Sequence, residues 1–156
     1  MLHQNSSIQD EPAAVRVRPA EPADVPAVIA LDAEETGLEK PDYWSELFER
    51  YGRGSRDRFF LIAEGGARPV GFIVGEVRAW EFGSPPSGWV FAINVTREAR
   101  LLGVGSRLFD AICVGFRQSG VRTVRTMLSK DAVLLMSFFR SQGMRAGPFI
   151  ELEKSL

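Results

Sequence analysis

Histidine and cysteine are nearly absent from this sequence of 156 residues. It contains one histidine, His3, and one cysteine, Cys113. A single cysteine cannot form a disulfide within the chain, and these two residues cannot supply the ligands of an ordinary zinc site. A Ser-His-Asp triad is also excluded in practice, because His3 stands in a polar N-terminal stretch. We therefore expect a metal-free protein of the cytoplasm.

Long apolar runs and a large excess of one charge are absent as well. No run approaches the ~20 residues of a membrane-spanning helix, and residues 1–14 lack the apolar centre of a signal peptide. Lys and Arg number 19 against 20 Asp and Glu, a net charge of -1, which disfavours a nucleic-acid binder that works by charge. We expect one domain over residues 15–156 after a disordered lead-in over residues 1–14, with no nucleic-acid or membrane partner.

The periodicity of apolar residues divides the chain into strands and helices. Strands are predicted over residues 15–19, 58–64, 70–80, 89–95, 121–128 and 148–154. Helices, each ending at a glycine, are predicted over residues 21–37, 41–52, 104–120 and 131–143. Residues 81–88 are rich in glycine and proline and should form a loop. This order predicts a single α/β (α+β) domain with a mixed, mostly antiparallel sheet and helices on its faces.

Two glycines one residue apart, Gly103 and Gly105, stand between a predicted strand and a predicted helix. Glycines in such a turn let a phosphate approach the N–H groups at the start of the helix. A dinucleotide fold would need a third glycine at Leu108 and an acidic residue on the next strand, which carries Arg125 instead. A P-loop would need a Lys directly after the glycines. The glycine pair alone also fits a tight turn without a ligand.

A wider window carries a resemblance to a known family. The segment "VTREARLLGVGSRLF" resembles the signature of the GNAT superfamily of acetyl-CoA-dependent N-acyltransferases, with Val95, Arg100, Gly103 and Gly105 matching by position. The segment "KDAVLLMSFFRSQGMR" independently resembles the last helix of that family, and the order of elements over residues 15–156 matches too. The resemblance implies a GNAT fold. It also implies transfer of an acetyl (acyl) group from acetyl-CoA to a primary amine, by direct attack in a ternary complex.

The resemblance further assigns a coenzyme site. Ile93, Asn94 and Val95 would lie along the pantetheine arm and stabilise the oxyanion. The start of the following helix would bind the pyrophosphate through its backbone N–H groups. The coenzyme-binding residues implied in this way are Arg100, Leu101, Leu102, Gly103, Val104, Gly105, Ser106, Phe138 and Phe139.

The positions at which the family usually places its acid and base hold other residues. Phe91 and Ala92 stand where a strand carboxylate is common, and Phe139 stands where a tyrosine usually protonates the leaving thiolate. Phenylalanine cannot donate a proton. Glu81 is our first candidate for a substitute base and Glu76 the second, although each also fits a solvated strand edge. The departures keep a second hypothesis open: a catalytically weak acyl-CoA-binding sensor or interaction module on a GNAT scaffold.

The acceptor is not identified by any motif. Trp44 and Phe48 could line an acceptor pocket, although aromatic residues at helical spacing also fit a core. No acidic cluster stands out, so small amines and the lysines or N-termini of proteins all remain as acceptors. Exposed strand edges, which often pair, make a homodimer possible.

Overall fold

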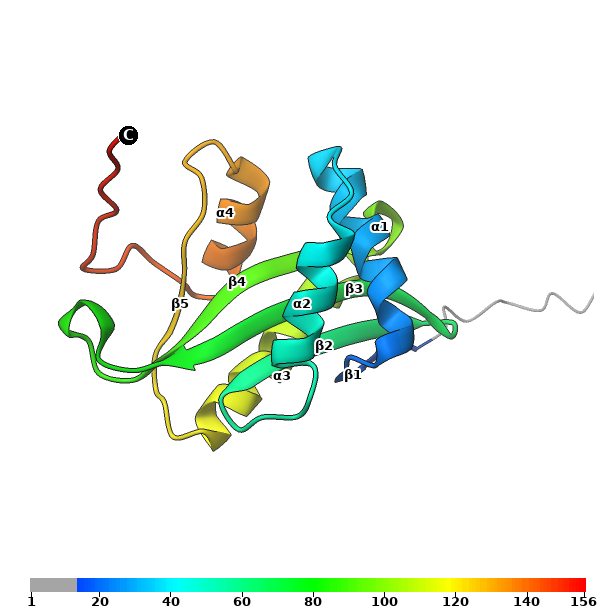
Figure 1. The fold of residues 1–156 in the computed structure, drawn as a ribbon, viewed down its shortest axis with the longest axis horizontal. Coiled ribbons are helices and arrows are strands. Elements are labelled where there is room, and N and C mark those ends of the chain that lie inside the picture. Colours follow the sequence, from blue (N-terminus) through cyan, green and yellow to red (C-terminus); the bar gives the residue numbers. More distant parts are fainter. Residues whose placement is uncertain (1–13) are drawn as a thin grey trace, which may run out of the picture.

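The computed structural model describes residues 14–156, in which a five-stranded sheet has helices on both faces (Figure 1). The strands are β1 (Arg16–Pro19), β2 (Arg58–Gly65), β3 (Arg68–Arg78), β4 (Ser87–Val95) and β5 (Val124–Thr126). The α-helices are α1 (Val25–Thr36), α2 (Pro41–Tyr51), α3 (Val104–Gln118) and α4 (Val133–Ser141). Single 3-10 turns are η1 (Pro22–Asp24), η2 (Glu81–Gly83) and η3 (Arg97–Leu102). Residues 1–13 of the lead-in expected over residues 1–14, with His3, lie outside the described residues.

The sheet is mixed, as predicted. Its strands follow the order β1-β2-β3-β4-β5, and every neighbouring pair is antiparallel except β4 and β5, which α3 connects as a parallel crossover. Along β3 and β4, Val74 lies opposite Ala92 while Gly75 lies opposite Val90, so Phe91 is an extra residue in β4. This bulge bends β4 at the point where β5 leaves it.

Alternating side chains of the sheet build a separate core on each face. Phe72 and Val74 of β3 join the cluster beneath α1 and α2, whereas Ile73 between them joins the cluster beneath α3. Figure 1 shows α1 and α2 in front of the sheet and α3 behind it. None of the helices within residues 14–156 is long and apolar enough to cross a bilayer.

The first predicted helix is divided in two. Its first turn is η1, and α1 begins only at Val25, because Pro22 and Pro26 cannot donate to the helical ladder. The carboxylate of Asp24 instead accepts the N–H of Glu21 at 2.7 Å. The other end agrees with the prediction, since α1 stops at Thr36 and Gly37 caps it.

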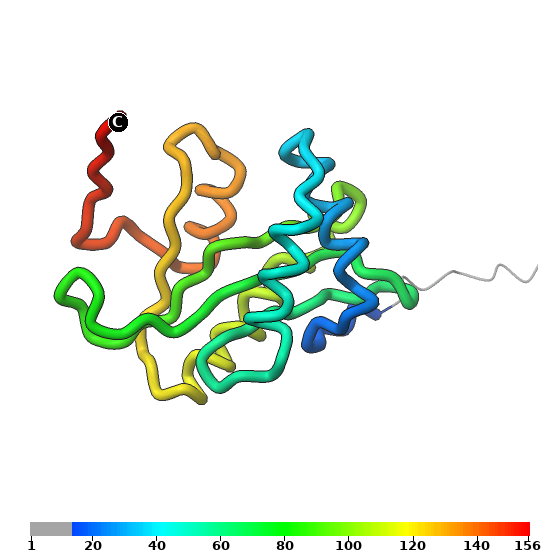
Figure 2. The backbone as a smooth tube through the Cα atoms, in the orientation of Figure 1, coloured from blue at the N-terminus to red at the C-terminus, as the bar shows by residue number. Residues whose placement is uncertain are grey.

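The last predicted strand is wrong. Residues 142–156 form neither helix nor strand, and residues 145–156 are all exposed. Figure 2 shows this segment running past β5 to the far edge of the molecule. The strand predicted over residues 121–128 is likewise reduced to Val124–Thr126. Apolar alternation produces a strand only where a partner edge is within reach, and within residues 14–156 the outer edge of β5 has no partner strand.

Candidate functional site

A cleft opens where β5 separates from β4. The two strands pair only between Gly88–Val90 and Val124–Thr126, yet β4 continues to Val95. The cleft has a volume of about 280 Å³. It is lined by Glu35, Ile93, Asn94, Val95, Arg100, Gly103, Gly105, Ser106, Leu134, Leu135 and Phe138.

The peptide groups of β4 alternate between β3 and this cleft. The N–H of Thr96 donates to the carbonyl of Val70 at 2.8 Å, so even-numbered residues at this end of β4 face β3. The peptide groups of Ile93 and Val95 therefore point to the opposite side, where β5 is missing. Asn94 points its backbone at β3, and its side-chain Nδ2 donates to the carbonyl of Leu31 on α1 at 2.9 Å. Ile93 thus offers its N–H and C=O to a ligand and Val95 its N–H, since the Val95 carbonyl accepts a hydrogen bond from Arg100. Asn94 instead connects α1 to the sheet.

The turn from η3 into α3 depends on both glycines. Gly103 has φ 73° and ψ 15°, a left-handed conformation that disfavours any side chain with a Cβ. At Gly105 a Cβ would lie 3.0 Å from Cε2 of Phe138 on α4. Val104 between them is fully buried and anchors the turn in the core. The unpaired N–H groups of the first turn of α3 are therefore held at one end of the cleft, where the helix dipole favours an anion.

Arg100 and Glu35 join two elements at the mouth of the cleft. Nε of Arg100 donates to the carbonyl of Val95 at 3.0 Å, and its Nη2 lies 2.7 Å from Oε2 of Glu35 at the end of α1. Among the described residues, Glu35 is the only carboxylate that lines the cleft. From the sequence, Glu34 and Glu35 close the first predicted helix near the expected acceptor site, but surface charge is the better interpretation of two adjacent glutamates there.

Helix α4 forms the apolar wall of the cleft. Leu134, Leu135 and Phe138 line it, and Leu134 is exposed to solvent. Phe139 points the other way and is buried, with its ring centroid 5.9 Å from that of Phe109 on α3. Helical spacing thus directs the two adjacent phenylalanines to different surroundings, one to the cleft and one to the core.

Most residues of the predicted coenzyme site gather around this one cleft. The lining includes Ile93, Asn94, Val95, Arg100, Gly103, Gly105, Ser106 and Phe138. The other four lie outside it: Leu101 and Leu102 are exposed on η3, and Val104 and Phe139 are buried. Ser106 also accepts a hydrogen bond from Nε2 of Gln142 at 2.9 Å, which ties the end of α4 to the start of α3.

The two predicted base candidates lie outside the cleft lining. The hydroxyl of Tyr51 donates to Glu76 at 2.7 Å, and Nε of Arg78 contacts the other oxygen of the same carboxylate at 2.9 Å. Burial, reinforced by the bond to Glu76, raises the pKa of Tyr51 to about 12. Glu81 is exposed on η2 and pairs with Nη1 of Arg78 at 3.7 Å. A catalytic role for either glutamate stays a prediction.

Trp44 and Phe48, the predicted acceptor-pocket residues, are buried between α2 and the sheet. The Trp44 ring lies 5.1 Å from Phe72, and its Nε1 donates to Asp32 at 2.9 Å. Phe48 packs against Phe60. Contact with an acceptor stays a prediction for both.

Groups that commonly perform metal or thiol chemistry are not assembled in the described chain. Within residues 14–156, no three side chains of His, Cys, Asp or Glu come together in a way that could hold a metal ion. Cys113 is half-buried on α3, and burial raises the pKa of its thiol. The thiol is therefore protonated and weakly nucleophilic at neutral pH.

Solved structures of the same fold cover nearly the whole chain. An aminoglycoside N-acetyltransferase, AAC(6')-Iy in complex with CoA, superposes with a TM-score of 0.82 at 15% identity, over 94% of this chain and 97% of that chain. A transcriptional regulator from Bacillus halodurans C-125 gives 0.77 at 15% identity, over 92% and 100%. AAC(6')-Ih from Acinetobacter baumannii gives 0.77 at 14%, over 92% and 99%. At such identities these likenesses establish the fold alone.

The family itself is established by sequence. No curated protein matches the chain. The profile of the acetyltransferase (GNAT) family, however, matches residues 25–144, which include the cleft and every helix that borders it. The chain therefore belongs to the GNAT family of acetyltransferases.

Proposed function

We propose that this protein transfers an acetyl group from acetyl-CoA to a primary amine in a ternary complex. One observation carries the proposal: the two glycines at the start of α3 and the free peptide groups of β4 border one cleft. This combination offers an anion site at one end and a strand-like edge along the side. Coenzyme A has the matching parts, a pyrophosphate and a pantetheine arm with two amides.

The residues of the cleft fit the coenzyme in three places. The N–H groups at the start of α3 would bind the pyrophosphate, with Gly103 and Gly105 leaving the backbone accessible. The peptide groups of Ile93 and Val95 would pair with the pantetheine amides as an added strand does. Leu134 and Phe138 would cover its apolar carbons. AAC(6')-Iy, which shares the fold, was solved in complex with CoA and with a bisubstrate analogue of CoA, which supports this assignment.

The reaction needs little chemistry from side chains. The amine nitrogen bonds to the thioester carbonyl carbon, the carbon–sulfur bond breaks, and the proton lost by the amine ends on the thiol. A free N–H on this side of β4, from Ile93 or Val95, would donate to the developing oxyanion. Alignment of two bound substrates can contribute ~7–11 kcal/mol, which suits a protein in which phenylalanine replaces the usual proton donor at position 139.

The acceptor that fits best is an amine with several positive charges. Residues 21–51, which hold α1 and α2, carry nine acidic and only two basic side chains, of which Asp24, Asp32 and Glu35 are already in ion pairs. Glu34, Glu39 and Asp42 are exposed at the end of α1, in the connection and at the start of α2, and Glu35, the neighbour of Glu34 in sequence, lines the cleft. Figure 1 shows that this connection and α4 project from the same end of the sheet. Several structures of this fold bear the names of aminoglycoside acetyltransferases, which supports an acceptor of this kind.

Thiol release tests the proposal. Purified protein would be mixed with acetyl-CoA and matched amines: an aminoglycoside, a linear polyamine, a monoamine and an amino acid. We expect release of free CoA with the multiply charged amines, and loss of this release in Gly105→Asp. Coenzyme binding by calorimetry without release for any amine would instead favour the acyl-CoA-binding sensor.

A further inference from the structure

The inner end of the cleft is closed where β4 and β5 come together. The last pair between the two strands is Val90↔Thr126, and the hydroxyl of Thr126 donates to the carbonyl of Val90 at 2.8 Å. Ile93 is the residue of β4 nearest to this pair that still lines the cleft. The paired strands therefore bound the cleft just beyond Ile93.

The proposed coenzyme would bring its acyl group to this closed end. The pyrophosphate site lies at Gly103 and Gly105, at the opposite end of the cleft lining. A pantetheine arm that follows the free peptide groups of β4 from Val95 to Ile93 leads away from α3 and toward Phe91. The methyl of an acetyl group would then lie near Ile93, and a longer acyl chain would extend past it.

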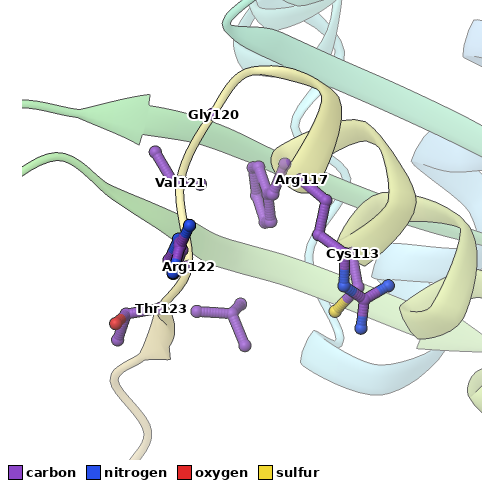
Figure 3. Close-up of a pocket in the computed structure, with 8 residues that line it drawn as sticks. Cys113, Arg117, Gly120, Val121, Arg122 and Thr123 are labelled. Carbon is purple, nitrogen blue, oxygen red and sulfur yellow. The ribbon is translucent and has the colours of Figure 1, made fainter.

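On the face covered by α3, core side chains fill the space behind the closed end. Val90 and Ile93 both belong to the cluster beneath α3, and Val90 is only 1% exposed. A hollow of about 460 Å³ borders α3 at Cys113 and Arg117 (Figure 3). It lies at the end of that helix, however, whereas the cleft lies at its start, and the two share no lining residue. A longer acyl chain would therefore have to leave on the face covered by α1 and α2.

The bulge in β4 places Phe91 across this exit. Val90 packs beneath α3 and Ala92 beneath α1 and α2, so these two residues do not share a face as they would in a regular strand. Phe91 is the extra residue between them, and its ring centroid lies 5.3 Å from that of Tyr51 on α2. The bulge thus directs Phe91 and Ala92 to the same face. Phe91 stands about 7 Å beyond Ile93 along the strand.

A series of contacts holds the ring of Phe91 in place. The Tyr51 ring meets it edge-on, at an interplanar angle of 72°. The hydroxyl of Tyr51 donates to Glu76 at 2.7 Å, and the same carboxylate accepts from Nε of Arg78 at 2.9 Å. Tyr51 is buried, so Phe91 cannot displace it without disturbing the core. Phe91 itself is 39% exposed and therefore stands between this core and solvent.

We propose that Phe91 limits the acyl group that this protein accepts to acetyl, because its ring occupies the direction that the other walls leave open. The inference rests on the proposed acetyl-CoA site and adds the residue that sets its acyl specificity. Removal of the ring should open space beside Ala92 and Tyr51 for longer acyl chains.

Binding of acyl-CoA thioesters tests the proposal without an identified acceptor. Calorimetry would measure Kd for CoA, acetyl-CoA, butyryl-CoA and hexanoyl-CoA with the parent, Phe91→Ala and Phe82→Ala. Phe82 is an exposed aromatic residue on η2, beyond the other end of β4. We expect the parent and Phe82→Ala to bind the two longer thioesters at least about tenfold more weakly than acetyl-CoA, since one misplaced methylene is worth about 10–200-fold. In Phe91→Ala, all three thioesters should bind within about threefold of one another.

A second variant covers the loss of the contact with Tyr51. Phe91→Leu keeps an apolar side chain there and should give a ratio between those of the parent and Phe91→Ala, with circular dichroism as the fold check for both. A parent that binds acetyl-CoA and hexanoyl-CoA equally, or folded Phe91 variants that keep the parent's ratio, would overturn the acyl limit and leave the coenzyme site standing. A parent that binds none of the four compounds would overturn the coenzyme site and the acyl limit together.

Discussion

Gly103 and Gly105 matter for different physical reasons, and the difference can be measured. At Gly103 there is room for a side chain, but the left-handed backbone opposes one. Gly54, in the connection from α2 to β2, has the same conformation and the same free space far from the cleft. Gly103→Val and Gly54→Val should therefore lose similar stability, about 1–2 kcal/mol.

Only the first of these two variants should lose coenzyme binding, because only Gly103 lies where the pyrophosphate must meet backbone. Gly105→Asp should lose binding as well, since it adds a negative charge at the start of α3. Calorimetric titration with CoA measures the affinities, and urea denaturation measures the stabilities. Equal affinity in the parent, Gly103→Val and Gly105→Asp would rule out this end of the cleft as the anion site.

Phe139 tests whether the protein needs a proton donor for the leaving thiolate. Because its ring is buried against Phe109, Phe139→Tyr would place a hydroxyl in the core without a partner and should cost about 1–3 kcal/mol. We expect no gain in kcat per folded molecule. Phe138→Tyr, at the position that does line the cleft, is the matched control and should keep parental stability. A large rise in kcat for Phe139→Tyr would mean that a donor is limiting after all.

The base is tested by pH profiles of three variants. Glu35→Gln, Glu76→Gln and Glu81→Gln would each be assayed for kcat/KM against pH. A carboxylate that accepts the proton of the amine gives an activity that falls as pH drops, and its removal should abolish this acidic limb and lower kcat by ~10²–10⁴. We expect the largest effect at Glu35, the carboxylate in the cleft lining. Parental rates in all three variants would mean that none of these carboxylates accepts the proton, and that the protein binds the amine in its unprotonated form.

At the scale of single elements, an ion pair connects η1 to the sheet. Arg18 of β1 donates to both carboxylate oxygens of Asp24, at 2.7 and 2.9 Å, and its Nε binds Glu64 of β2 at 2.6 Å. The hydrogen bonds from Arg18 hold the pKa of Asp24 below its ordinary value of 3.8. Asp24→Asn should cost about 1.5–3 kcal/mol of stability at neutral pH.

The pH dependence of this loss has a definite sign. A lowered folded pKa means that Asp24 contributes its full stability above pH 3.8 and loses it as the pH falls through the folded value. The difference between parent and Asp24→Asn in urea denaturation should therefore shrink below pH 4. A difference that stays constant down to strongly acidic pH would show that the charge of Asp24 is not what stabilises η1.

Elements that are marked by residues within the same short stretch of sequence were predictable, and those that depend on distant parts of the chain were not. The helix beginning at Val104 and the turn before it follow from glycine spacing within one short stretch. That stretch also supplies most of the cleft, because residues 93–106 are continuous in the chain. Glu35 and Leu134 reach the same cleft from helices far away in sequence, and nothing in their own neighbourhood indicates this. The strand predicted over residues 148–154 failed for a related reason, since pairing depends on a second edge.

At the scale of the whole molecule, charge is unevenly distributed. Residues 21–51 have an excess of acidic side chains. The rest of the chain has an excess of basic ones, so the net charge is only -1. A cationic acceptor should be attracted to that side, so kcat/KM for a multiply charged amine should fall steeply with salt and that for a monoamine only slightly.

A charge-reversal pair makes this test specific. Glu34→Lys/Glu39→Lys should raise KM for a multiply charged amine several-fold, while Asp110→Lys, on the opposite face of the sheet, should not. Steady-state kinetics at two ionic strengths measures both effects. Equal KM values in the parent and the double variant would mean that the α1–α2 surface does not attract the acceptor.

The early separation of β5 from β4 has a consequence for handling the protein. If pantetheine supplies hydrogen bonds that a fifth strand would otherwise make, the coenzyme is a structural component of the sheet while it is bound. The melting temperature then becomes a function of coenzyme concentration, with a gain of about 2.7 kcal/mol at a hundredfold excess over Kd. Protein that retains CoA through purification should have a higher melting temperature than protein from which CoA has been removed. Variants should therefore be compared at a fixed coenzyme concentration.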